Sequence, residues 1–241
     1  MKNVKSVLFV ALSLALFASC SSDDDDKMEK SSVKVSIKTT MGKEELPLPF
    51  ELTTFQINIS EIEFDVSEGS KIKLPQETKL NKSSPINLLS DKASSGIVVA
   101  TTNISNATYK EVELKLDVYN EENDSYKELK SNSVYASGFF SLDGTNQTDF
   151  VIKSEKKLEV ELEYEENLEL NGTSTNVLID LNIDKIIQEL VVGISKIVEN
   201  PPLGFELQFE EDGSLQITKD KNQLLLTAFE NSLIDGFTLV E

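Results

Sequence analysis

Hydrophobic and polar residues alternate through much of this chain, and that period of two constrains its fold more than any other feature. Alternation is typical of strands that bury one face and expose the other. Runs of this kind lie at residues 33–37, 55–59, 62–66, 112–118, 139–142, 150–152, 158–164 and 177–183. Turn-forming residues separate them, so the sequence predicts a mainly β, antiparallel sandwich over residues 33–183.

Two local details refine this prediction. The alternation of Ile57 and Ile59 resumes at Ile62 one residue out of phase, which indicates a bulge or bend near Ser60. Residues 120–124 predict a turn that leads into Tyr126 and Leu129.

Residues 184–241 follow a different pattern, which predicts an α+β extension. Apolar residues recur at helical spacing over 186–198, with Asp184 as the expected N-cap and prolines at 201 and 202 as the stop. A hairpin about Asp212 and Gly213 follows. A second helix is expected over 220–233, with Asp220 and Gln223 as a capping box. This helix–hairpin–helix pattern does not indicate whether the extension packs on the sandwich.

The first nineteen residues predict a secretory signal peptide. Lys2 and Lys5 precede an apolar run over 7–17, and the small residues Ala18 and Ser19 follow it. The apolar run is too short for a membrane-spanning helix, which needs about 20 residues.

Residues 16–20, Leu-Phe-Ala-Ser-Cys, resemble the lipobox of bacterial lipoproteins, although Phe17 is bulkier than the usual residue. The resemblance implies cleavage before Cys20 and attachment of acyl chains to that cysteine. Two or more chains, at about 0.8 kcal/mol per buried CH₂, hold a protein stably on a membrane. Cys20 is therefore the expected lipid attachment site. The alternative is an ordinary secreted protein with a cysteine at its cleavage site.

Residues 20–32 form the expected lipidated, acidic tether. Within it, Ser22, Asp23, Asp24, Asp25 and Asp26 resemble the export signal that sends lipoproteins of Bacteroidota-type bacteria to the cell surface. The resemblance implies an outer-membrane protein displayed outside the cell; without export, the chain would face the periplasm. The alternative is a charged spacer, since the run lacks the glycine and the ligand spacing of a calcium loop.

Composition excludes most familiar catalytic machinery. The chain has no histidine and no tryptophan, and Cys20 is its only cysteine. Ser/His and Cys/His nucleophile pairs, imidazole metal sites, thiolate zinc sites and disulfides within the chain are therefore excluded. Chemistry based on carboxylates or hydroxyls, and oxygen-ligated Ca²⁺ or Mg²⁺, remains. The formal net charge of −19 argues against nucleic acid as a partner.

Three segments of the body resemble a bacterial lipoprotein family known as domain of unknown function 4382. They are Ile57-Asn58-Ile59-Ser60-Glu61-Ile62-Glu63-Phe64, Ile86-Asn87-Leu88-Leu89 and Tyr109-Lys110-Glu111-Val112-Glu113-Leu114-Lys115-Leu116. The resemblance covers residues 33–183 and implies a Greek-key, prealbumin-like sandwich. Ala107 stands where the family often has glycine, and no catalytic residues are carried over.

Candidate sites consist of carboxylates. Glutamates at 159, 161, 163 and 165 share one strand face, about 6.6–7 Å apart along the strand, and Glu61 and Glu63 share another. Such spacing could serve a glycosidase pair or a Ca²⁺ site. A solvated outer face that guards the sheet against edge pairing is the favoured interpretation. Residues 120–124 and 143–146 are interpreted as turns, and the tyrosines as core or edge residues.

These observations favour a membrane-anchored, noncatalytic binding module for an envelope protein or a glycan. Two alternatives stay open. One is a calcium-dependent or carboxylate-based glycan-active module, with Ca²⁺ as the one cofactor considered. The other is a structural envelope or fimbria-like component.

Overall fold

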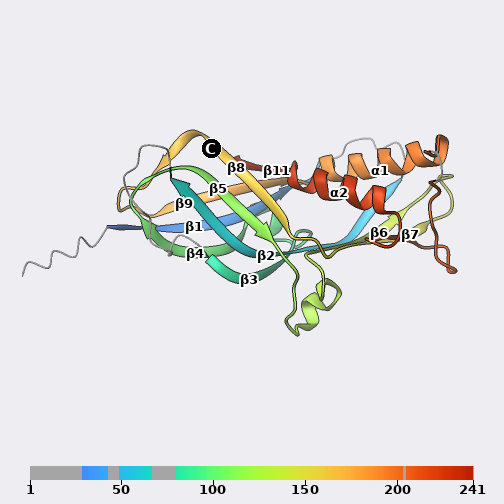
Figure 1. Cartoon of the computed structure of the whole chain (residues 1–241), viewed down its shortest axis with the longest axis horizontal. Coiled ribbons are helices and arrows are strands. Elements are labelled where there is room, and N and C mark those ends of the chain that lie inside the picture. The colour runs from blue at the N-terminus through green and yellow to red at the C-terminus, as the bar shows by residue number, and fades with distance from the viewer. Residues whose placement is uncertain (1–28, 43–48, 67–79, 203–204, 241) are drawn as a thin grey trace, which may run out of the picture.

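The computed structural model describes residues 29–42, 49–66, 80–202 and 205–240. They form a mainly β molecule with two sheets and a few helices, which confirms the predicted fold class at that level. Figure 1 shows β1 beginning at one end of the long axis and α1 lying toward the other.

Sheet A has four strands in the order β11-β9-β1-β4. Its bounds are β1 Lys30–Thr40, β4 Ile97–Ser105, β9 Thr175–Asn182 and β11 Phe237–Val240. In β1, Val33, Val35 and Ile37 are fully buried, whereas Lys34 is exposed, as the alternation predicts.

Sheet B has seven strands, in the order β10-β7-β6-β2-β5-β8, with β3 also paired to β2. Its bounds are β2 Phe50–Val66, β3 Leu80–Asn87, β5 Thr108–Leu116, β6 Val134–Phe140, β7 Thr148–Ser154, β8 Leu158–Glu169 and β10 Leu215–Ile217.

The long strand β2 organises sheet B. Its pairings with β3 and β5 both shift register between Ile59 and Glu61, which confirms the irregularity predicted near Ser60. Residues 50–57 of β2 pair with β6, and residues 59–66 pair with β5.

Asn58 lies where β5 ends and β6 begins. Its backbone N–H donates to the Ser133 carbonyl at 3.0 Å, and its carbonyl accepts from the Asp117 N–H at 3.2 Å. Its buried side chain donates to the Asp117 carbonyl at 2.9 Å and accepts from Ser83 Oγ at 2.9 Å. One asparagine therefore fixes the chain on both edges of β2.

Not every strand pair is antiparallel, so that part of the prediction needs correction. Strands β1 and β9 pair in parallel from Val33 to Thr40, and β10 pairs in parallel with β7. Both sheets are therefore mixed. The two pairs join segments that are far apart in sequence, and local alternation carries no information about strand direction.

The loop after β5 also differs from the prediction. Tyr126 and Leu129 lie in the 3₁₀ segment η3 (Asp124–Leu129) rather than in a strand. Leu129 is buried with Tyr119 and Tyr135 in a small cluster of its own. A second 3₁₀ turn, η2, spans Ala93–Ser95.

Helix α1 (Ile183–Glu199) matches the predicted amphipathic helix, but its cap is different. The Asn182 side chain accepts from the Lys185 N–H at 3.0 Å, whereas the Asp184 carboxylate accepts from the Gly42 N–H. Asp184 therefore joins the helix to the end of β1 instead of capping it.

Helix α2 (Gln223–Ile234) begins after Asn222, and the predicted capping box of Asp220 and Gln223 is absent. Asn222 adopts a left-handed φ of 55° and is buried. Its amide accepts from the Gln208 N–H at 3.0 Å and donates to the carbonyls of Gln208 and Gln216 at 2.9 and 2.7 Å. It therefore ties together the arms of the preceding hairpin.

Apart from the small cluster around Leu129, the described elements share one hydrophobic core. It contains buried side chains from both sheets and from both helices, and Phe55 of β2 lies 6.0 Å from Phe229 of α2 between ring centroids. Strands β10 and β11 extend sheets B and A respectively. Residues 184–240 therefore pack against the β body.

Candidate functional site

Ionisable side chains, most of them acidic, cluster on one face of sheet B. Cross-strand pairing places Glu61, Lys115 and Glu159 in one row, Glu63, Glu113 and Glu161 in the next, and Asp65, Glu111 and Glu163 in a third. Neighbouring strands lie about 4.8 Å apart, so these side chains are close neighbours. We call these nine residues the acidic face.

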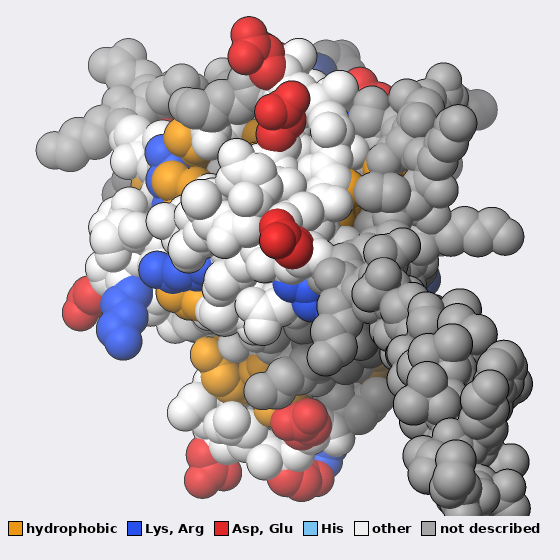
Figure 2. All heavy atoms as spheres, turned by 90° about the vertical axis from the view of Figure 1, so that its left-hand side faces the viewer, with side chains coloured by type: hydrophobic (Ala, Val, Ile, Leu, Met, Phe, Trp, Pro, Cys, Tyr) orange, Lys and Arg blue, Asp and Glu red, His pale blue; other side chains and the backbone are white. Residues whose placement is uncertain are grey.

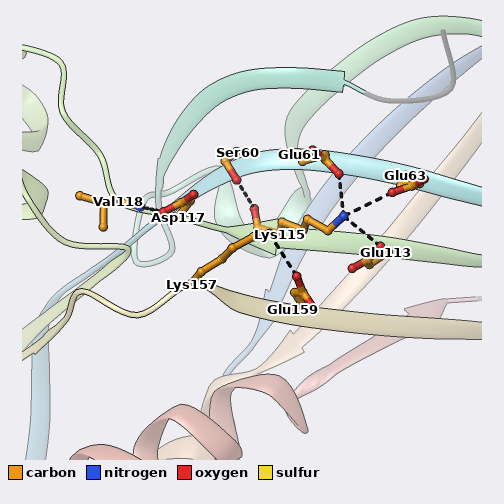
Figure 3. Close-up of polar contacts among 9 residues, drawn as sticks. All are labelled: Ser60, Glu61, Glu63, Glu113, Lys115, Asp117, Val118, Lys157 and Glu159. Carbon is orange, nitrogen blue, oxygen red and sulfur yellow. Dashed lines mark hydrogen bonds and ion pairs between the residues drawn. The ribbon is translucent and has the colours of Figure 1, made fainter. Parts of the chain in front are cut away.

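Lys115 is the cation of this array. Its Nζ lies 2.7 Å from Glu61 Oε1 and 3.3 Å from carboxylate oxygens of Glu63 and Glu113 (Figure 3). Its side chain is 13% exposed. The hydrogen bond from Lys115 to Glu61 raises the pKa of the ammonium above its usual value, against the opposing effect of burial. Lys115 therefore stays charged over the whole physiological range.

Glu111 lies in the third row, between Asp65 and Glu163. Burial raises the pKa of its carboxyl, and nearby Asp65 adds to the rise. Lys110, with its Nζ 3.7 Å from Glu111 Oε2, opposes the rise, and Glu161 and Glu163 support it. On the acidic face, the carboxylates around Lys115 are therefore paired with its positive charge. Glu111, in contrast, is partly buried and has like-charged neighbours, which oppose its ionisation.

The predicted glutamate ladder on β8 lies on an exposed face, as its favoured interpretation required. Glu159, Glu161, Glu163 and Glu165 are all exposed. The last three line a cavity of about 450 Å³ between β8 and β11, together with Thr238 and apolar residues. All of its acids come from this one strand face. A glycosidase needs two carboxyl groups in different environments, and the cavity lining does not supply them.

The charged side chains are distributed differently at the end of the molecule where β1 begins. Figure 2 shows separate acidic and basic side chains there, scattered among uncharged side chains and backbone. The described atoms at this end therefore form no continuous acidic surface of the kind on sheet B.

The segment at 143–146 forms a turn, as predicted. The Asp143 carboxylate accepts from the N–H groups of Thr145 and Asn146, both at 2.8 Å. These bonds hold the pKa of Asp143 well below its usual value. Residues 120–123 lie in the loop before η3, which begins at Asp124. Tyr109, Tyr119 and Tyr135 are buried, as core packing predicts.

The residues predicted to form the lipid anchor and export signal precede the described part of the chain. Cys20 and the export-signal residues Ser22, Asp23, Asp24, Asp25 and Asp26 lie outside the described residues. Within the described ranges, no three His, Cys, Asp or Glu side chains are grouped to hold a metal ion. No helix in the described part is long and apolar enough to cross a membrane.

Two residues of structural weight, Lys115 and Asn58, have no distinct sequence signal. Lys115 occupies one polar position in a run of alternating residues, and only the strand register places it beside Glu61. Asn58 occupies what the alternation treats as an outward position, yet it is 1% exposed.

Comparisons with known proteins found no matching family model, no matching curated protein and no matching solved structure.

Proposed function

We propose that this chain is a lipid-anchored protein of the bacterial outer membrane, displayed on the cell surface, that acts as a noncatalytic binding module. The observation that carries the proposal is the position of the only cysteine, Cys20, directly after an apolar run and before Asp23–Asp26. We propose further that the β body has the Greek-key, prealbumin-like connectivity that the family resemblance implies.

The segment between Cys20 and β1 is short enough to hold the β body close to the membrane. Nine residues lie between Cys20 and Lys30, the first residue of β1, so ten residue-to-residue steps join them, and a fully extended chain spans at most about 3.3–3.6 Å per step. The body would therefore lie within roughly 36 Å of the acyl chains. Its β1 end would then lie nearer the membrane than α1 (Figure 1).

Electrostatics favours neutral or cationic partners. The net charge of −19 and the like-charged rows of the acidic face repel anionic headgroups and nucleic acids. An envelope protein or an uncharged glycan is compatible with this charge. The absence of histidine from the whole sequence supports a noncatalytic role.

Metabolic labelling with a palmitate analogue tests the anchor. The wild-type chain should incorporate the label and fractionate with the outer membrane, whereas Cys20→Ser should lose both properties. The matched control is Ser21→Ala, which changes the neighbouring residue and should keep the label. Equal labelling of the Cys20→Ser chain would show that the anchor assignment is wrong.

Protease treatment of intact cells tests surface display. With Asp23, Asp24, Asp25 and Asp26 all replaced by alanine, the labelled chain should become protected, because it would remain on the inner side of the outer membrane. Unchanged cleavage would show that the aspartates are not needed for export, and it would not contradict the proposed lipid anchor.

A further inference from the structure

Exposed sheet edges are hazards that proteins normally block with short strands, charges or proline. Four edges of these sheets have such protection. Strands β10 and β11 span only three and four residues. Strand β3 contains Pro85, and β8 carries glutamates at positions 159, 161, 163, 165, 166 and 169.

Strand β4, the remaining edge, has neither charge nor proline. Its sequence is Ile-Val-Val-Ala-Thr-Thr-Asn-Ile-Ser, and no residue from 93 to 109 is charged in a chain that is 27% charged. Among the described residues β4 pairs with β1 alone. Val98 is 49% exposed. An uncharged, β-branched edge of this kind is a template for a further strand.

A cavity of about 270 Å³ lies beside this edge, in the seam between the two sheets. It is lined by Ile59, Ile62, Ser84, Val98, Val99, Ala100 and Thr101. Val99 is the extra residue where the β1–β4 register shifts, and its carbonyl accepts from Ser84 Oγ at 3.4 Å. Beyond this contact, residues 100–105 continue the edge.

We propose that β4 is a strand-addition site for an extended, uncharged segment of another protein with bulky apolar residues at alternate positions. Its backbone would pair with residues 100–105, and one apolar side chain would enter the cavity. Strand addition obtains affinity from main-chain hydrogen bonds and specificity from such pockets. The proposal deepens the proposed function, on which it rests only in treating the chain as a binding module.

Charge selects this occupant over a second copy of the chain. Two copies would each bring a net charge of −19, and their self-repulsion opposes close approach. A neutral segment meets no such barrier along β4. The bulge at Val99 also interrupts the regular pairing that a symmetric β4–β4 contact would need.

The experiment uses the full chain purified in detergent and a fluorescent nine-residue peptide of alternating leucine and threonine with lysine at both ends. Binding is followed by fluorescence anisotropy. A control peptide has proline at each threonine position and so lacks those backbone donors. The wild-type chain should bind the first peptide saturably and the second at least about tenfold more weakly. Amide hydrogen exchange in residues 100–105 should slow in the complex.

Val98→Lys places a charge at the mouth of the cavity and should weaken binding at least about tenfold. Its matched control is Val198→Lys on α1, because both valines are 49% exposed. The control should bind as the wild type does. If Val98→Lys does not fold, Thr101→Lys, at another exposed residue of the cavity lining, should have the same effect.

Three results would overturn the proposal: no saturable binding of the alternating peptide, equal binding of the proline peptide, or equal loss in both valine variants. A dimer of the wild-type chain that Val98→Lys dissociates would assign the edge to a second copy instead. None of these results depends on lipid labelling, so failure of the anchor at Cys20 would leave the peptide measurements unchanged.

Discussion

Individual charges on the acidic face differ in what they contribute to stability. Lys115 contacts three carboxylates, those of Glu61, Glu63 and Glu113. Glu111 instead faces Asp65 and Glu163 across the strands, and burial raises its carboxyl pKa. A raised carboxyl pKa means that the folded chain still holds a proton at a pH where the unfolded chain has lost it. Ionised Glu111 therefore reduces stability at neutral pH.

Glu111→Gln should consequently stabilise the protein at pH 7, by about 0.5–1 kcal/mol, because it removes a like-charge contact. Stability loss from Glu111 sets in as the pH rises through the window between its unfolded and folded pKa values. Below that window, residue 111 is uncharged in the wild type and in the variant, so the stability difference between the two proteins should vanish. Urea unfolding of both proteins at pH 7 and near pH 3 measures the difference in their free energy of unfolding.

The control for this variant is Glu159→Gln on the same face. Glu159 lies 3.1 Å from Lys157 Nζ, and both side chains are about half exposed. Removing its charge should change stability little, because exposed ion pairs contribute about 0–1 kcal/mol. A loss of stability in Glu111→Gln at pH 7 would contradict the assignment of strain to Glu111.

At the scale of elements, the pairing of β2 with β6 depends on a glycine. The register shifts between Leu52 and Thr54, and the Thr53 hydroxyl donates to the Ser137 carbonyl at 3.1 Å. A Cβ on Gly138 would lie 1.9 Å from the Glu51 carbonyl oxygen, which belongs to the backbone and cannot move aside freely. The two strands can therefore approach this closely only without a side chain at position 138.

Gly138→Ala should destabilise the chain by about 2–4 kcal/mol, since the added methyl group forces β2 and β6 apart. Thermal unfolding measures the loss. The matched control is Gly193→Ala in α1, where the new Cβ would lie 3.2 Å from the end of the Leu225 side chain and would meet no backbone atom of another segment. Alanine is the better helix former by about 1 kcal/mol, so the control should be neutral or stabilising. Equal losses in both variants would contradict the close-approach argument.

The molecule as a whole should unfold as one unit. Residues 184–240 contribute two helices to the common core and one strand to each sheet. Ser154 Oγ of β7 donates to the buried Glu230 of α2 at 2.6 Å, so polar contacts also cross this junction. Strands β1, β7, β8 and β9 of the β body therefore pack directly against the extension.

A chain that ends at residue 183 should therefore lose its cooperative thermal transition, because the truncation exposes the core around Phe55 and removes β11 from sheet A. Near-ultraviolet circular dichroism during heating tests this. A chain that begins at residue 29 is the control and should keep a single sharp transition. A sharp transition in the truncated chain would show that the sandwich folds alone.

Several features of the fold could be predicted from the sequence because they are recorded along the chain. The alternation that marks most strands, the irregularity near Ser60 and the helical spacing after Asp184 reflect which face of each segment is buried. The exposure of the β8 glutamates follows from the same periodicity. The lack of histidine and the position of Cys20 depend on no fold at all.

Other features were decided by contacts between distant segments. Strand β4 has an uncharged sequence without clear alternation, and its edge position depends on β1 pairing with β9 on its other side. The place of Lys115 among three carboxylates requires the register of β2 against β5. Asn222 became the junction of the hairpin because the chain folds back on itself there. Sequence periodicity specifies burial within a segment, whereas partner, direction and register are fixed only when the whole core packs.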